Sequence, residues 1–266
     1  MRTPYLSSSL EDARVHPVRN KEDEAAAFAL LRSGARIAFD CETAGINFFD
    51  ELRLVQFSDQ RDAFAFNPHQ WPQLVHELAE HPHRVAHNAP FDCQHLARFT
   101  GKPVAEILKG VTDTFILAHL VDPRDARDGG VGHHLKDLAA HYVDENAPHG
   151  DKLLKARFKE LGYKQNEAWA LIDIEDPTYV LYGGIDCIIT ARLVDELTKL
   201  VARHGLGHLV KFDHQVQTIT STMRERGIAI DLEYAQGLLK ELERECEQAE
   251  RMASALGCEN VNSPTQ

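Results

Sequence analysis

The sequence lacks paired cysteines and long apolar runs. Its five cysteines are scattered and form no C-x-x-C pair, which excludes a disulfide framework and a thiolate zinc site. No uncharged apolar stretch reaches the roughly 18 residues that a membrane-spanning helix needs, and the N-terminal residues contain no apolar segment typical of a signal peptide. We therefore expect a cytoplasmic protein that does not bind membranes.

The chain is also short of basic residues. Lys and Arg number 29 against 41 Asp and Glu, a formal net charge of −12. This balance argues against binding of nucleic acid through a broad basic surface, so a polyanionic ligand would need local help, for which metal ions are the obvious source. With 266 residues, 43% hydrophobic and 26% charged, the chain is expected to form one large folded domain, or one domain with a partial second.

Strands are expected first and helices later, which describes one α/β or α+β domain. A helix is predicted over 22–33, an apolar strand over 36–40, a hairpin over 52–66, a helix over 70–79 and a short strand over 84–87. Helices then dominate, predicted over 90–99, 113–121, 133–142, 151–160 and about 177–204. Two more, heavily charged on their outer faces, are predicted over 207–225 and 232–255, and they mark a different element.

The first candidate site is Asp40 and Glu42, at the predicted end of the first strand. Residues two apart on a strand share a face, so the two carboxylates occupy one small volume. Their repulsion is tolerable with a divalent cation between them, and hard oxygen ligands suit Mg²⁺ or Mn²⁺. Taken alone, D-x-E is equally consistent with a turn that follows a strand.

Two further candidates lie downstream. Asn88 is predicted at a strand exit and Asp92 in the first turn of the helix that Pro90 begins, where an acid also complements the helix dipole. Tyr182 and Asp186 form an i, i+4 pair on one face of the long helix. The two glycines between them cost roughly 1 kcal/mol each in a helix, which indicates close approach of another backbone or a ligand, or helix packing.

Taken in order, D-x-E, N-x-x-F-D and Y-x-x-x-D resemble the motifs of the proofreading-type 3′–5′ exonucleases with four acidic residues (the DEDD superfamily), in the subclass with a tyrosine in the third motif. The segments GVTDTFILAHLVDP at 110–123 and HHLKDLAAHYV at 133–143 look like the intervening helices of that family. The resemblance covers about 33–205. It implies a ribonuclease H-like fold, a mixed β-sheet flanked by helices.

The C-terminal stretch 212–245, followed by NSPTQ at 262–266, looks like the entry to the thumb of a family A DNA polymerase. The expected organisation is therefore a leader with a short helix over 1–32, an exonuclease domain over 33–205 and the long helices of an incomplete thumb over 206–266. The implied partners are single-stranded DNA or a frayed 3′ end, and the remainder of a polymerase.

The resemblance implies a two-metal hydrolysis, in which two Mg²⁺ or Mn²⁺ ions about 3.5–4 Å apart activate water and stabilise the leaving group. Asp40 would bridge both ions, Glu42 and Asp186 would complete the site of the ion that activates water, and Asp92 would anchor the second ion through water. Tyr182 would orient the attacking water, because a phenol with a pKa near 10 is a poor base at neutral pH.

The same resemblance assigns Asn88 to the terminal nucleotide, while Ile46 and Phe91 offer apolar surfaces to unstacked bases. Phe91 is equally suited to the core. The predicted activity is proofreading during DNA replication, with release of nucleoside monophosphates from the 3′ end. The alternatives are a 3′–5′ exoribonuclease, against which the thumb-like segment argues, and a catalytically silent binding module, against which the complete acidic set argues.

Overall fold

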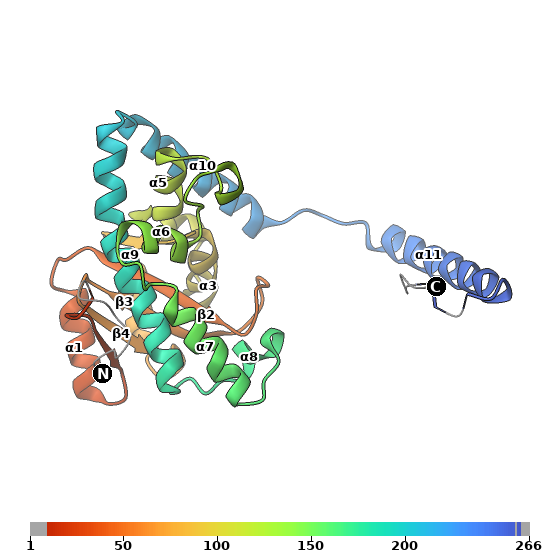
Figure 1. The fold of residues 1–266 in the computed structure, drawn as a ribbon, viewed down its shortest axis with the longest axis horizontal. Coiled ribbons are helices and arrows are strands. Elements are labelled where there is room, and N and C mark those ends of the chain that lie inside the picture. The colour runs from red at the N-terminus through yellow and green to blue at the C-terminus, as the bar shows by residue number, and fades with distance from the viewer. Residues whose placement is uncertain (1–9, 259, 262–266) are drawn as a thin grey trace. The chain divides into compact units, whose positions relative to one another are not determined.

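The computed structural model describes residues 10–258, 260 and 261, and it divides into two compact units, Met1–Glu225 and Arg226–Gln266 (Figure 1). The NSPTQ segment lies outside the described residues. No helix in the described part of the chain is long and apolar enough to cross a membrane.

A mixed sheet with the strand order β1-β4-β3-β2-β5-β6 forms the centre of the first unit. Strand β3 runs antiparallel to both of its neighbours, β2 and β4, whereas β1, β5 and β6 each run parallel to the neighbour they pair with. The strands are β1 (Arg14–Pro17), β2 (Ile37–Thr43), β3 (Leu52–Ser58), β4 (Asp62–Phe66), β5 (Arg84–Ala86) and β6 (Val111–Asp113). The predicted mixed sheet flanked by helices is confirmed.

Helices cover both faces of this sheet. One face packs against α1 (Lys21–Leu31), α2 (Pro72–Glu80), α3 (Pro90–Thr100) and α4 (Val104–Leu108). The other packs against α5 (Thr114–Val121), α6 (Leu135–Tyr142), α7 (His149–Glu160), α8 (Gln165–Leu171) and α9 (Pro177–Arg203). A short 3-10 turn, Ala126–Asp128, lies between α5 and α6, and α10 (Gly207–Arg226) follows α9.

Strand β2 is longer than predicted, so the D-x-E pair lies inside the strand and not at its end. Ile37, Phe39 and Cys41 face the core on the α1–α4 side, and Ala38 packs on the α9 side. By strand alternation Asp40 and Glu42 share the face of Ala38. Strand β3 pairs with β2 past the acids, with Asp40 opposite Gln56 and Glu42 opposite Leu54, whereas β5 pairs only with Ile37 and Ala38.

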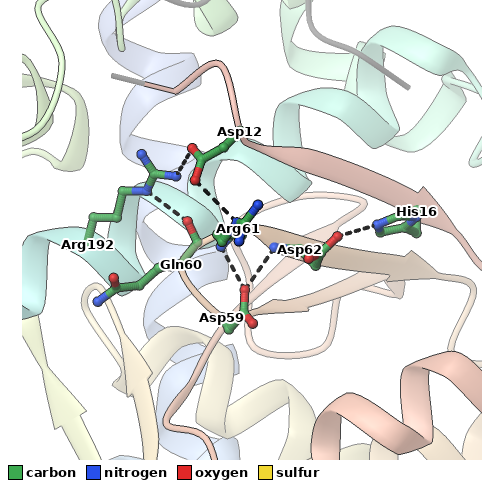
Figure 2. Close-up of polar contacts among 7 residues, drawn as sticks. All are labelled: Asp12, His16, Asp59, Gln60, Arg61, Asp62 and Arg192. Atoms are coloured by element: carbon green, nitrogen blue, oxygen red, sulfur yellow. Dashed lines mark hydrogen bonds and ion pairs between the residues drawn. The ribbon is translucent and has the colours of Figure 1, made fainter. Parts of the chain in front are cut away.

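Edge strand β1 falls in the stretch that the sequence indicated as a leader. His16 Nε2 lies 2.7 Å from Asp62 Oδ1, and Arg192 of α9 donates to Asp12 at 2.8 Å (Figure 2). Asp59 accepts from the backbone N–H groups of Arg61 and Asp62 and so closes the β3–β4 turn. The His16–Asp62 and Asp12–Arg192 contacts join β1 and the residues before it to β4 and α9. The four residues of β1 are too few to show a strand pattern in the sequence.

Helix α9 lies directly on the sheet because of its two glycines. Asp176 caps the helix by accepting from Thr178 N at 2.9 Å, with Pro177 at the first helical position. A Cβ at Gly183 would collide with the side chain of Gln56 on β3, and one at Gly184 with Val15 on β1. The two glycines therefore let α9 pack closely on side chains of the sheet, and not on another backbone, a ligand or a second helix as the sequence indicated (Figure 1).

The second unit contains α11 (Leu232–Ala255), which Asp231 caps by accepting from Tyr234 N at 3.0 Å. None of its described residues is buried, and large apolar side chains along it are exposed: Leu232, Tyr234, Leu238, Leu239, Leu242 and Met252. Its opposite surface is densely charged, as predicted.

Candidate active site

Asp92 reaches the acidic strand because β5 is short. Beyond Ala38 the edge of β2 that faces β5 has no strand partner, and Asp92 Oδ1 accepts from Cys41 N at 3.0 Å in place of a ladder bond. Pro90 begins α3, which puts Asp92 in the first turn as predicted. The bond joins α3 to β2 and buries the Asp92 carboxyl next to Asp40.

Asn88 occupies the turn that leads into α3, with a left-handed φ of 62°, the only such value at a non-glycine among the described residues. Asparagine tolerates this conformation better than most residues. Asp113, fully buried, accepts from the N–H groups of Asn88 and Ala89 at 2.9 Å each and caps α5 through Phe115 N at 2.8 Å. Sequence reasoning placed Asp113 only in an intervening helix and missed this positioning role.

The third motif places Tyr182 and Asp186 one turn apart on α9, over the acidic face of β2. A hydrogen bond from Tyr182 favours the charged form of Asp186 and so lowers its pKa, against the larger effect of burial, which raises it. Lys136 of α6 forms an ion pair with Asp186, and its Nζ lies 4.7 Å from the centre of the Tyr182 ring. No sequence motif identified Lys136.

The four acids form one electrostatic cluster. Burial, and then the charge of Asp186, raises the pKa of Asp40 to about 7. Burial, and then the charge of Asp40, raises the pKa of both Glu42 and Asp92 well above the usual range. Lys136 opposes this by lowering the pKa of Asp40, Glu42 and Asp186. The first and third motifs therefore converge on a common volume, and Asp92 joins them through Asp40.

The donor chemistry of this cluster fits a hard divalent cation. In the described part of the chain no three Asp, Glu, His or Cys side chains are already arranged to hold a metal ion. However, Glu42 Oε1 is buried without a hydrogen-bond partner, and a buried carboxylate oxygen in that condition is unfavourable unless a cation or donor reaches it. Carboxylate oxygens are the ligands that Mg²⁺ and Mn²⁺ prefer.

The apolar residues predicted to contact unstacked bases of the substrate lie near these motifs in the sequence, but their side chains differ in solvent exposure. Ile46, on the loop between β2 and β3, is 84% exposed. Phe91 is half-buried, with its ring 5.0 Å from that of His95. The same loop also exposes Phe49, which sequence reasoning missed although the NFFD run signals it; Arg98 lies 5.8 Å from its ring and donates to Phe48 O at 2.5 Å.

Cys41, Cys93 and Cys187, each adjacent to a candidate acid, are buried and unbridged. Burial and the neighbouring carboxylates raise the pKa of all three thiols well above the usual range. They are thus protonated, inert packing residues behind the site.

A buried cluster of acids at the junction of a mixed sheet and its helices defines a nuclease-like α/β class of protein. Residues 15–202 match the family described as 3′–5′ exonuclease, in its DNA polymerase A form. The chain is 34% identical over 236 residues to a DNA polymerase of Mycobacterium phage L5, with 85% of this chain and 40% of that protein covered. The chain belongs to the family of 3′–5′ exonuclease domains of family A DNA polymerases, a family of hydrolytic nucleases.

Solved structures share the ribonuclease H-like fold. Escherichia coli RNase D, an exoribonuclease involved in structured RNA processing, superposes with a TM-score of 0.59 at 13% identity, covering 79% of this chain and 51% of that one. Brucella melitensis NrnC with bound Mg²⁺ superposes with a TM-score of 0.54 at 18% identity, covering 82% and 96%.

Proposed function

We propose that this chain is a metal-dependent 3′–5′ exonuclease that hydrolyses DNA from its 3′ end to nucleoside monophosphates, as a proofreading activity. The observation that carries the proposal is the convergence of Asp40 and Glu42 from β2 with Asp186 from α9, and of Asp92 from α3 with Asp40, in one buried cluster. Membership of the polymerase exonuclease family supports it. So do the raised pKa values of the acids, since strongly perturbed pKa values cluster at functional sites.

The position of each acid in the cluster suggests which ion it would hold. Asp40, at the centre of the cluster, would bridge two ions, Glu42 and Asp186 would complete one ion site, and Asp92 would support the other. Bound Mg²⁺ or Mn²⁺ would supply a more acidic water and charge stabilisation of the leaving oxygen. The strong net negative charge, −12, makes such ions equally necessary for the approach of a phosphate backbone.

Tyr182 would hold and orient the attacking water with its hydroxyl. Burial, and then the charge of Asp186, raises the phenol pKa well above its usual range, so its proton stays in place at neutral pH. Asn88, fixed by Asp113, would contact the terminal nucleotide. Ile46 and Phe91 would flank unstacked bases of a single strand or a frayed 3′ end.

The chain spans 40% of the length of the phage polymerase it matches. We infer that residues 206–266 are the start of a polymerase thumb, that the remainder of a polymerase is the partner of this chain in replication, and that the protein acts in the cytoplasm. The predicted domain limits at 32/33 and 205/206 belong to this proposal.

Hydrolysis of a 3′-labelled single-stranded DNA oligonucleotide in Mg²⁺ or Mn²⁺ tests the proposal. We expect release of labelled mononucleotide, abolished by EDTA and by Asp40→Ala. Asp128→Asn, which changes an exposed carboxylate in the 3-10 turn, is the control and retains activity. A folded wild type that is inert in both metals would favour the silent binding module.

The second candidate is a 3′–5′ exoribonuclease. The fold shared with RNase D favours it, because that protein is an exoribonuclease. Matched DNA and RNA oligonucleotides of one sequence separate the two: faster cleavage of RNA would overturn the DNA assignment while retaining the site.

A further inference from the structure

Lys136 places a positive charge inside the candidate site. Its helix is held by neighbours that pack in the core, Leu135 and Leu138, and its side chain is 19% exposed. The ammonium forms an ion pair with Asp186, itself 6% exposed at the side chain, and lies over the face of Tyr182. A lysine so placed contacts both residues of the third motif.

The ammonium is also within electrostatic range of the β2 acids, because it favours the charged forms of Asp40 and Glu42. It is therefore the internal cation of the cluster. Like charges at short range in a buried site repel strongly, since little water screens them. A divalent ion held by Asp186 and the ammonium of Lys136 cannot share that carboxylate without this cost.

We propose that Lys136 is a displaceable counter-ion: it neutralises the acidic cluster of the metal-free protein and must leave Asp186 when a divalent ion binds. This inference rests on the proposed function and deepens it, because Lys136 then sets the metal concentration at which the site loads. The flexible four-carbon stem of lysine lets the charge swing to solvent while α6 stays in place.

The main test is Mn²⁺ binding by titration calorimetry to the full chain. Lys136→Met removes the charge at similar length, and we expect about tenfold tighter Mn²⁺ binding, or about 1.4 kcal/mol. In EDTA the same variant should unfold at a lower temperature than wild type, because its acids lose their counter-ion. Lys136→Arg keeps the charge and should bind Mn²⁺ within about twofold of wild type if charge is what matters.

The matched control is Lys199→Met. Lys199 pairs with Glu196 at 2.7 Å on the exposed surface of α9. Its loss should change neither Mn²⁺ affinity nor the melting temperature in EDTA beyond the small effect of a surface ion pair. Unchanged or weaker Mn²⁺ binding by folded Lys136→Met overturns the inference.

A measurement on the wild type covers the case in which Lys136→Met does not fold. Modification by an amine-reactive reagent, read by mass spectrometry, should increase at Lys136 when Mn²⁺ replaces EDTA, while Lys199 stays constant. No increase at Lys136 overturns the inference.

The two proposals fail separately. If wild type cleaves DNA but Lys136→Met has wild-type Mn²⁺ affinity, the counter-ion role is wrong and the exonuclease stands. If Lys136→Met binds Mn²⁺ more tightly but wild type cleaves no nucleic acid, the counter-ion role is supported and the proposed function is wrong.

Discussion

The acidic cluster and helix α11 depart from the usual distribution of polar and apolar residues in opposite directions. In the cluster, Glu42, Asp92 and Asp186 are carboxylates with less than a tenth of their surface exposed. On α11, Tyr234 is 69% and Leu239 is 57% exposed. Burying charge and exposing large apolar groups are both unfavourable, so each is informative where it occurs.

The two departures differ in how the chain compensates them. The cluster has built-in partners: Cys41 N for Asp92, Lys136 and Tyr182 for Asp186. On α11 the described apolar side chains lie on a single helix, so no burial offsets their exposure. Burial of the acidic cluster therefore lowers the stability of the first unit. Removal of α11 should change the stability of that unit little.

The largest expected effect comes from removing one buried charge. Glu42→Gln should lower exonuclease activity roughly thousandfold, because a carboxylate ligand contributes several kcal/mol to the transition state. In EDTA at pH 8 it should raise stability by about 1 kcal/mol or more, since the neutral amide removes a buried negative charge that Asp40 and Asp186 repel. Cleavage assays and urea unfolding measure the two effects.

Glu241→Gln, on an exposed turn of α11, is the control and should change neither quantity. If Glu42→Gln loses both stability and activity, the buried acids do not lower the stability of the folded protein.

His87 is a half-buried histidine in the first unit whose protonation is unfavourable in the folded state. Burial lowers its pKa to about 4, and the ring contacts Thr114 Oγ1 at 2.9 Å and His133 O at 3.0 Å. The unfolded chain takes up this proton near pH 6.5 and the folded chain does not, so stability is complete above 6.5 and falls as pH decreases toward 4. The loss reaches up to about 3 kcal/mol.

Urea unfolding of His87→Gln between pH 7.5 and 4.5 should show a shallower decline than wild type. His208→Gln, at an exposed position, is expected to follow the wild-type curve. Parallel curves for wild type and His87→Gln would show that this histidine is protonated in the folded state.

Gly184→Ala tests the seating of α9 on the sheet. The added methyl meets Val15 of β1, and overpacking of this kind costs about 1–3 kcal/mol, more than the roughly 1 kcal/mol gained in helix propensity. Gly237→Ala on α11 is a matched control, because nothing lies within 4 Å of an added Cβ there. Equal stabilisation by both substitutions, in calorimetric melting, would mean that α9 has room above β1.

The smallest effect is expected from deleting 226–266. The melting temperature of the first unit should change by less than about 2 °C, because that unit contains the sheet, its flanking helices and their buried cores. Sedimentation should show less self-association once the exposed apolar residues are gone. A large drop in melting temperature would show that the first unit depends on α11.

The long elements and the acids were predictable from local signals. Pro90 and Pro177 mark the starts of α3 and α9, and the apolar run before Asp40 marks β2. The extension of β2 through Cys41 and Glu42 could not be predicted, because acidic residues after an apolar strand usually indicate a turn. Pairing with β3 keeps these residues extended. Strands β1 and β6 were missed since three or four residues carry too little periodicity.

Two residues of the site could not be predicted from the sequence, because their roles depend on contacts between distant segments. Lys136 lies in the first turn of a short amphipathic helix, where a lysine is ordinarily solvated, and the approach of α9 makes it part of the cluster. Asp113 ends a strand and caps α5, which explains it locally; its bonds to Asn88 and Ala89 depend on the neighbouring strand β5. The roles assigned to the acids, Tyr182, Asn88, Ile46 and Phe91 remain predictions.

The bond between Cys41 N and Asp92 has a consequence for the time course of folding. It joins residues 51 positions apart, and the Lys136–Asp186 pair joins residues 50 apart. Contacts between residues so distant in sequence slow folding, because the entropy of closing the intervening loop is lost before the contact forms. During synthesis, a chain that has reached α6 holds Asp40, Glu42 and Asp92 but lacks α9, so the complete cluster appears only after Asp186 has emerged and docked.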